Sequence, residues 1–433
     1  MKVAVIGAGW AGCAAAWALK SQGHAPTVFE SARHIGGRAR RIYSPKLQRE
    51  LDNGQHILLG AYTQTLGLLR ELGLDESTRL HRQELDIVAA QGDFRLRNRA
   101  LPAPWHLLAG LLSAQGIGWR QKLKLARFCR WLETQRWRAP DGLTVLQLLD
   151  RHGQDADLIR LFWQPLCVAA MNTPIEQACA QLFAHVLRDS LGGPRQASQP
   201  LIPLTDLGRL WCEPALHELD VHLGHRVQSL QLTKDGVDVD SQPFDAAILA
   251  CPPPQARRLL STLPSTAHSE QLLADLDAMQ YVPIATLYLD LNQPWNLPHP
   301  MLMLHDVTGS AGQWLFDHSA LKPDGRETLL AIVVSDAIRL QALPREQAIA
   351  AIVEQIRSQT QRFGPMPTVR NTELIIEKRA TFAAVPGLRR PSVTTAWPAL
   401  RLAGDWTNTG YPGVLEGAVR SGLQAAHSLG TTT

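Results

Sequence analysis

Short apolar runs and one alanine-rich stretch define the first elements of the chain. Residues 3–6 form an apolar run typical of a fully buried strand, and residues 27–30 predict a second strand. Between them, residues 10–22 are rich in alanine and leucine and predict a helix that ends at Gly23. The first 30 residues therefore predict one βαβ unit, the start of a parallel sheet.

The pattern changes after this unit. A helix is expected over 66–72, and residues 76–200 have the apolar spacing of a mostly helical region. Short strands are expected at 226–232, 236–240 and 246–250, before three prolines at 252–254 break the chain. Later apolar runs predict strands at 281–291, 328–335 and 400–403, and helices at 348–363 and 413–428.

Composition narrows the classes of protein. Hydrophobic residues make up 45% and charged residues 19%, which is typical of a globular protein. The formal charge of +4 weakly favours an anionic surface such as phospholipid and makes no case for nucleic acid. Six cysteines without a C-x-x-C pair predict reduced thiols in the cytoplasm. We expect no signal peptide, no membrane-spanning helix and no metal site.

A glycine-rich turn joins the first strand to the first helix. Residues 7–12 fit G-x-G-x-x-G, in which Gly7 permits the tight turn, Gly9 lets the backbone approach a pyrophosphate, and Gly12 allows close helix packing. Glu30 ends the second strand, where a carboxylate can accept both ribose hydroxyls and would repel a 2′-phosphate. The residues expected to bind a dinucleotide are Gly7, Ala8, Gly9, Trp10, Ala11, Gly12, Glu30 and Ser31.

Two further segments point to FAD. Gly36-Gly37-Arg38 resembles the G-G-R extension of FAD-dependent amine oxidases and carotenoid desaturases, where it lies along the cofactor. Residues 402–422 resemble the A-G-D … E-G-A … S-G segment that closes the same flavoprotein superfamily. For Glu416, the alternative is that it only stabilises the start of the last helix and has no further role. The further cofactor-binding residues that the resemblance implies are Gly36, Gly37, Arg38, Gly54, Gln55, His56, Val227, Gly404, Asp405, Gly413, Val414, Leu415 and Ala418.

The resemblance also assigns a position to each end of the cofactor. Arg38 would face the pyrophosphate or the flavin, and Asp405 a ribitol hydroxyl or phosphate edge. The backbone of Val227 would meet the adenine, while the N–H groups of Val414 and Leu415 would point at the pyrimidine end of the flavin. A helix N-terminus there would stabilise an anionic reduced flavin.

The expected fold class is α/β and amine-oxidase-like. At 433 residues, the chain is longer than one hydrophobic core usually serves. We predict a discontinuous Rossmann-type FAD-binding domain made of 1–75, 201–265 and 396–433. The inserted substrate domain, with a mixed sheet and helices, would consist of 76–200 and 266–395.

One segment points to a substrate class. Residues 52–62, which begin Asp52-Asn53-Gly54-Gln55-His56, resemble the hydroxysqualene dehydroxylases, the squalene-associated branch of the desaturase-like family, and so do residues 165–174. The resemblance implies reductive removal of an allylic hydroxyl from a C30 isoprenoid, with FAD reduced beforehand by NAD(P)H or a partner reductase. His56 is the candidate proton donor and Gln55 the candidate to orient the hydroxyl, although a purely structural histidine remains open.

Three other functions share the same motifs. A phytoene-type desaturase would have the same fold and a lipid substrate but would run the flavin in the oxidising direction. A flavin amine oxidase is less favoured, because Ala285 and Thr286 stand where a lysine is expected. A non-catalytic flavin-binding protein would keep the nucleotide motifs alone.

Residues 101–130 form a helical segment that we expect to contact a membrane. The first part is apolar and contains Pro102, Pro104, Trp105 and Trp119. The basic residues that follow are Arg120, Lys122, Lys124, Arg127 and Arg130. Such a segment is too interrupted to span a bilayer but suits the interface between lipid and water. The alternative interpretation is a helix in the internal core of the insertion. The expected location is cytoplasmic, peripheral at the inner face of the cytoplasmic membrane.

Overall fold

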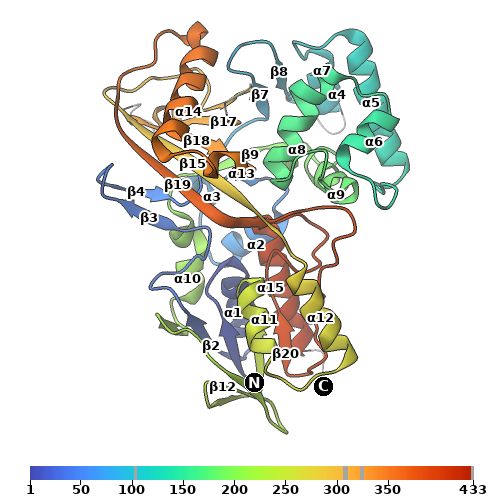
Figure 1. Ribbon diagram of the computed structural model, residues 1–433, viewed down its shortest axis with the longest axis vertical. Coiled ribbons are helices and arrows are strands. Elements are labelled where there is room, and N and C mark those ends of the chain that lie inside the picture. Colours follow the sequence, from blue (N-terminus) through green and yellow to red (C-terminus); the bar gives the residue numbers. More distant parts are fainter. Residues whose placement is uncertain (102–104, 306–310, 322–325, 431–433) are drawn as a thin grey trace.

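A parallel sheet forms the part of the molecule that carries both chain ends (Figure 1). The computed structural model describes residues 1–101, 105–305, 311–321 and 326–430. The strand order is β10-β2-β1-β14-β20, and every neighbouring pair is parallel. The strands are β1 (Lys2–Ile6), β2 (Ala25–Glu30), β10 (Asp220–Leu223), β14 (Ala246–Leu249) and β20 (Leu400–Leu402).

Two helices pack together against this sheet. They are α1 (Trp10–Ser21) and α15 (Leu415–Gly430), which come from opposite ends of the chain. They approach so closely that a Cβ on Gly422 would lie 2.1 Å from the carbonyl oxygen of Ala11. The central strands β1 and β14 are buried along most of their length, as expected for a sheet covered on both faces. The N- and C-terminal segments are therefore parts of one core.

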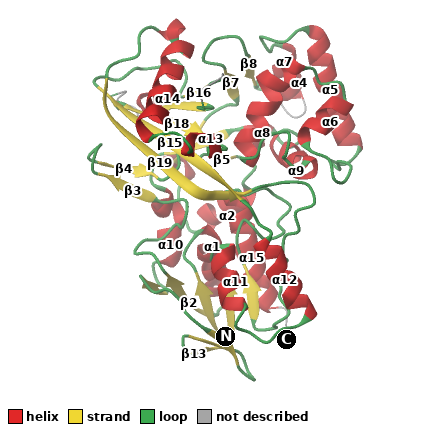
Figure 2. Cartoon of the chain, in the orientation of Figure 1, coloured by secondary structure: helices red, strands yellow, loops and turns green. Residues whose placement is uncertain are grey.

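An antiparallel sheet lies above the parallel one (Figure 1). Its order is β16-β17-β18-β15-β19. Figure 2 shows its two long strands crossing the middle of the molecule. The strands are β15 (Tyr281–Leu291), β16 (Met301–Met303), β17 (Trp314–Asp317), β18 (Leu329–Val334) and β19 (Val369–Phe382), with helices α13 (Ile338–Gln341) and α14 (Arg345–Gln359). All five strands fall within 266–395, while the parallel strands fall within 1–75, 201–265 and 396–433.

A largely helical insertion lies beside the antiparallel sheet (Figure 2). Its core is aromatic, with the ring of Phe128 edge-on to Trp163 at 5.3 Å. Of the predicted segment 101–130, residues 102–104 lie outside the described residues. The helices are α4 (Trp105–Leu112), α5 (Trp119–Thr134), α6 (Val145–Arg151), α7 (Ala156–Leu158), α8 (Gln164–Met171) and α9 (Ala180–Ser190). The short helix α3 (Glu76–Arg79) lies apart from them and contacts β6 (Leu80–Arg82).

Short strands connect these three parts. A hairpin of β3 (Arg41–Ser44) and β4 (Arg49–Asp52) follows the first βαβ unit. A three-stranded sheet has the order β5-β9-β6, and β7 pairs with β8. The remaining strands are β5 (Leu58–Leu59), β6 (Leu80–Arg82), β7 (Asp86–Val88), β8 (Arg95–Arg97), β9 (Pro200–Pro203), β11 (Leu230–Leu232), β12 (Val237–Val239) and β13 (Gln242–Phe244). The other helices are α2 (Thr63–Glu71), α10 (Glu213–Leu216), α11 (Pro253–Leu260) and α12 (Ala267–Asp277).

Some local expectations were wrong. The prolines at 252–254 begin helix α11 rather than only breaking the chain, because proline suits the first helical turn. The strand expected at 226–232 is present only as Leu230–Leu232. Strands β6, β7 and β8 lie in the region expected to be mostly helical, and the pattern gave no sign of the long strand β19. Among the described residues, no helix is long and apolar enough to cross a membrane.

Candidate FAD site

The glycine-rich turn lies at the carboxyl ends of β1 and β14, where the strand order of the sheet reverses. Ligands of open α/β sheets bind at this crevice. Gly7 has φ +112°, and a Cβ there would lie 2.6 Å from the carbonyl oxygen of Ala250. A Cβ on Gly12 would lie 1.8 Å from the carbonyl oxygen of Gly7. These two glycines are therefore explained by contacts within the protein.

Gly9 is not explained in this way. A Cβ at Gly9 would meet nothing closer than the Cα of Gly37, at 3.8 Å. Gly9 is the N-cap of α1 and has no side chain with which to cap this helix start. Because the first N–H groups of a helix attract an anion, the open space in front of Gly9 fits the pyrophosphate of FAD. The side chain of Trp10 instead packs into the core, edge-on to Trp211 at 5.2 Å.

Glu30 lies at the end of β2, as the sequence predicts, and is 9% exposed. Its Oε2 accepts a hydrogen bond from the Ala8 N–H at 2.7 Å. Its Oε1 accepts from the Ala32 N–H at 2.8 Å and from the Ser31 hydroxyl at 3.1 Å. An ionised carboxylate has about four acceptor positions, so Glu30 can hold the glycine turn and still accept from a ribose.

Gly36, Gly37 and Arg38 connect the two ends of the chain. The Gly36 N–H donates to the Ala8 carbonyl at 2.9 Å, so this segment lies against the glycine-rich turn. Arg38 Nη2 lies 2.5 Å from Asp405 Oδ1, and Nη1 donates to the Ala380 carbonyl at 2.7 Å. Burial alone would lower the pKa of Arg38, but the attraction of Asp405 raises it above its usual value. The guanidinium therefore stays charged and offsets the carboxylate, which would otherwise repel a phosphate.

The loop before α15 lies next to Asp405. A Cβ on Gly413 would lie 3.3 Å from Asp405 Oδ2. The Val414 N–H, expected to face the flavin, donates to the Pro412 carbonyl at 2.8 Å in this structure. The helix begins at Leu415, two residues after the expected start at 413, and Ala418 continues it with an N–H···O bond to Val414 at 3.2 Å.

Glu416 holds a neighbouring helix. Its carboxylate is 1% exposed and accepts from the N–H groups of Gln64 and Thr65 at 3.0 and 3.1 Å, at the start of α2. It also accepts from Arg420 Nε at 2.8 Å. Glu416 therefore does more than start a helix. It lies in the first turn of α15, and its carboxylate also caps the start of α2.

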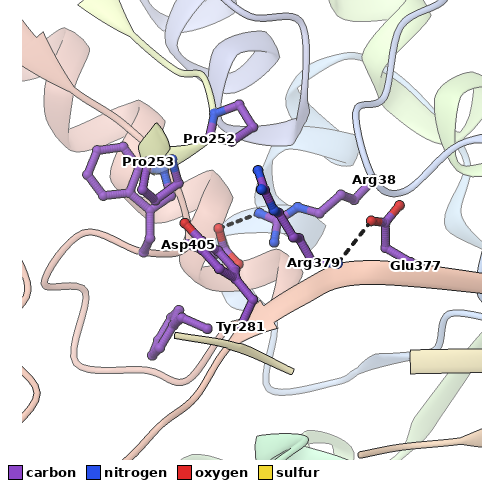
Figure 3. Close-up of a pocket in the computed structure, with 9 residues that line it drawn as sticks. Arg38, Pro252, Pro253, Tyr281, Glu377, Arg379 and Asp405 are labelled. Atoms are coloured by element: carbon purple, nitrogen blue, oxygen red, sulfur yellow. Dashed lines mark hydrogen bonds and ion pairs between the residues drawn. The ribbon is translucent and has the colours of Figure 1, made fainter. Parts of the chain in front are cut away.

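A cavity of about 180 Å³ opens where the two sheets meet (Figure 3). Arg38 and Asp405 reach it from loops that follow strands of the parallel sheet, and Tyr281, Glu377 and Arg379 from the antiparallel sheet. The other lining residues are Pro252, Pro253, Phe382 and Trp406. Burial raises the pKa of Tyr281 to about 12. Its hydroxyl is buried and has no hydrogen-bond partner among the described residues, so it is free to bond a cofactor.

Val227 is buried, and its carbonyl accepts from Arg258 Nη2 at 2.6 Å. Val227 was expected to lie within a strand, but it precedes strand β11. Sequence reasoning missed Tyr281, Glu377, Arg379 and Phe382 because they lie on strands remote from the glycine motifs and carry no spacing signal. For Pro252, Pro253 and Trp406, the sequence offered one weak indication of a place in the cavity, namely their position next to the ends of predicted strands.

Asp52 and His56 form a hydrogen-bonded pair beside this region. His56 Nδ1 lies 3.0 Å from both carboxylate oxygens of Asp52, and the His56 N–H donates to Asp52 Oδ2 at 2.7 Å. Burial raises the pKa of Asp52, but attraction to His56 and bonds from its ring and backbone outweigh this and lower the pKa below its usual value. Asn53 Nδ2 donates to the Arg38 carbonyl at 3.1 Å, which places the pair next to the Gly36–Arg38 segment.

Gln55 is held in an unusual conformation. It has φ +47°, a left-handed backbone that is uncommon for a residue other than glycine, and it is 7% exposed. Its Oε1 lies 2.8 Å from His318 Nε2. The Tyr288 hydroxyl donates to the Asp52 carbonyl at 2.9 Å. Segment 52–56 is thus fixed by the antiparallel sheet as well as by the first domain.

These features were compared with known proteins. The sequence profile described as flavin containing amine oxidoreductase matches residues 10–429. The chain belongs to this family. Together with the fit of the glycine turn, Glu30, Arg38 and Asp405, the match confirms the expected FAD cofactor and an FAD-dependent oxidoreductase.

Curated relatives refine the resemblance. The chain is 30% identical to a hydroxysqualene dehydroxylase of Rhodopseudomonas palustris, over 98% of this chain and 97% of that protein. It is 28% identical to the hydroxysqualene dehydroxylase of Zymomonas mobilis over the same shares. A zeta-carotene desaturase of Zea mays is 24% identical over 98% of this chain and 83% of its own length. The predicted resemblance to hydroxysqualene dehydroxylases is confirmed.

Solved structures agree on the fold. An oxidoreductase from Methanosarcina mazei matches 99% of this chain and 100% of its own, with a TM-score of 0.75 at 16% identity. Cyclohexylamine oxidase from Brevibacterium oxydans matches 99% and 98%, with a TM-score of 0.70 at 17% identity. The predicted amine-oxidase-like α/β fold is therefore confirmed.

Proposed function

We propose that this enzyme removes the hydroxyl of hydroxysqualene reductively and releases squalene. The proposal is carried by the near-full-length similarity to three hydroxysqualene dehydroxylases, at 28–30% identity. The second candidate, a carotenoid-type desaturase, is supported by relatives at 22–24% identity. The two reactions use the flavin in opposite directions, so they can be separated by experiment.

The Asp52–His56 pair is the proposed proton donor. Asp52 holds the Nδ1 side of the ring, and among the described residues no group bonds Nε2. A histidine held in this way presents one nitrogen for proton transfer. In the proposed reaction Nε2 gives a proton to the allylic hydroxyl, which leaves as water when the C–O bond breaks. Reduced FAD, when bound, supplies the hydride that forms the new C–H bond, so the substrate is reduced and the cofactor oxidised.

Gln55 is the proposed residue that orients the hydroxyl. Its side-chain amide is hydrogen-bonded to His318, and its backbone has a left-handed conformation. The Gln55 side chain is therefore already ordered before the substrate binds. The electron donor of the flavin is proposed to be NAD(P)H or a partner reductase. We also propose that the protein works in the cytoplasm, peripherally at the inner face of the cytoplasmic membrane, because its substrate is a C30 isoprenoid.

Anaerobic reduction of the FAD-loaded enzyme separates the candidates. On addition of hydroxysqualene we expect the flavin to reoxidise and squalene to form in equal amounts. A desaturase would leave the reduced flavin unchanged, and its oxidised flavin would instead be reduced by a carotenoid precursor. A flavin that stays reduced with hydroxysqualene contradicts the proposal.

Substitution of His56 by alanine tests the proton donor. We expect the variant to keep FAD with an unchanged absorbance spectrum but to lose turnover by about tenfold or more, as is typical of a lost general acid. His427→Ala is the control, because His427 lies on the exposed face of α15 and, within the part of the chain that the structure describes, bonds the Leu423 carbonyl alone. An unchanged turnover rate in His56→Ala would remove this residue from the mechanism.

A further inference from the structure

Helices α4 and α5 carry an unusual concentration of exposed apolar side chains. Trp105 is 59% exposed, Leu112 66% and Trp119 69%. The others in this region are Leu101, Leu108 and Leu123, so half of the large hydrophobic residues that are exposed in the described structure fall between 101 and 123. Trp105, Leu108 and Leu112 recur at helical spacing on α4, and Trp119 and Leu123 on α5, and exposed apolar side chains gathered in one region mark a binding site. We call these six side chains the α4–α5 face.

The exposure is not a consequence of loose packing. The opposite side of α4 is buried through His106, Gly110 and Leu111. A Cβ on Gly110 would lie 2.7 Å from the Arg97 carbonyl, so α4 is pressed against the end of β8. Helix α5 buries Phe128 and Leu132 in the aromatic core of the insertion. Each helix therefore also presents large apolar side chains that no described residue covers: Trp105, Leu108 and Leu112 on α4, and Trp119 and Leu123 on α5.

The surroundings of the α4–α5 face are basic. Residues 101–132 contain no Asp or Glu, and their Lys and Arg residues are Arg120, Lys122, Lys124, Arg127 and Arg130. Lys124 pairs with Asp155 and Arg130 with Glu133, which leaves Arg120, Lys122 and Arg127 without a carboxylate partner among the described residues. Arg97 and Arg99, at and just after the end of β8, are also exposed. Arg120 lies over the ring of Trp119 at 5.5 Å, and Lys122 Nζ donates to the Leu112 carbonyl at 2.7 Å. Cations thus border the exposed tryptophan and leucine side chains directly.

We infer that the α4–α5 face docks on a bilayer containing anionic phospholipid. Tryptophan and leucine enter the interface between headgroups and acyl chains, while the neighbouring lysines and arginines bind lipid phosphates. A second copy of the chain fits less well, because a two-fold contact would set the same basic residues against each other. The inference deepens the proposed peripheral location and does not depend on which reaction the enzyme catalyses.

Vesicle flotation of the FAD-loaded protein tests the docking face. We expect binding to phosphatidylcholine vesicles that contain phosphatidylglycerol, weaker binding to phosphatidylcholine alone, and loss of the difference in high salt. The double variant Leu112→Ser/Trp119→Ser should bind at least about tenfold less. Its matched control is Ile338→Ser/Leu343→Ser, two residues that are 57% and 43% exposed elsewhere and should leave binding unchanged.

Three outcomes contradict the inference. Wild-type protein that floats with neither vesicle, or a double variant that floats as well as wild type, overturns it. So does a dimer in analytical ultracentrifugation without lipid that Leu112→Ser/Trp119→Ser dissociates, because the face would then join two copies. Turnover measured in detergent micelles is independent of docking and should be equal in both double variants. A wild-type protein inactive in detergent but bound to vesicles would contradict the reaction alone.

Discussion

At the scale of single residues, three glycines of one motif have different reasons to be glycine. Gly7 and Gly12 are required by the fold, because any Cβ would collide with backbone atoms at 2.6 and 1.8 Å. Gly9 faces open space in front of the α1 N-terminus. The sequence motif is the same for all three, and only the contacts separate folding from cofactor binding.

This difference predicts opposite results for two alanine substitutions. Gly9→Ala should change the stability of the FAD-free protein by no more than about 1 kcal/mol, but should weaken FAD binding by about tenfold or more because the methyl group occupies the space of the pyrophosphate. Gly12→Ala should fail to fold or unfold at a much lower urea concentration. Fluorescence titration with FAD and urea unfolding measure the two effects. Unchanged FAD affinity in Gly9→Ala would contradict the proposed position of the pyrophosphate.

At the scale of elements, hydrogen bonds from distant segments fix the loops that carry chemistry. Glu416 on α15 caps α2, and Tyr288 on β15 donates to the Asp52 carbonyl at the end of β4. Arg38 joins Asp405 after β20 to the first βαβ unit. None of these contacts is local in sequence, so each loop depends on elements that lie far away along the chain.

The Asp52–His56 pair predicts a pH dependence of stability. Because the folded-state pKa of Asp52 lies below its ordinary 3.8, its ionised form stabilises the folded protein at neutral pH, and this contribution is lost as the pH falls through the folded-state pKa. Asp52→Asn should therefore lower the free energy of unfolding by roughly 1.5–3 kcal/mol at pH 7, and the difference from wild type should shrink below about pH 4. Urea unfolding at several pH values measures this.

The control for this prediction is Asp235→Asn. Asp235 lies in an exposed turn, so its substitution should leave stability unchanged at every pH. A difference between wild type and Asp52→Asn that stays constant down to acid pH would mean that the carboxylate charge is not what stabilises segment 52–56.

At the scale of the whole molecule, one buried side chain links the helical insertion directly to the sheet that lines the cofactor cavity. Asn172 ends α8 in a left-handed conformation, with φ +46°. Its Nδ2 donates to the Val282 carbonyl of β15 and to the Thr381 hydroxyl of β19, while its Oδ1 accepts from the Asp336 N–H. The helical insertion is thereby fixed to the sheet that lines the cavity.

Asn172→Ala should accordingly lower the free energy of unfolding by about 2–4 kcal/mol, because three partners, two of them buried, lose their bonds and the left-handed backbone becomes strained. Asn172→Gly relieves only the strain and should remain clearly less stable than wild type. Both are measured by urea unfolding, with proteolysis of the insertion as a second readout. A glycine variant as stable as wild type would show that backbone conformation alone matters at this position.

The sequence by itself determined the βαβ unit, the FAD motifs at both ends and the family. Glycine spacing, the apolar strand pattern and the position of Glu30 are local features, and together they are specific for FAD binding. Local pattern also placed Trp105 and Trp119 in an apolar, basic segment. Only the tertiary structure decided that Tyr281 and Arg379 line the cavity, that Glu416 caps α2 and that Trp105 and Trp119 are exposed. Those facts depend on which distant strands and helices pack together, and residue order along the chain does not encode such contacts locally.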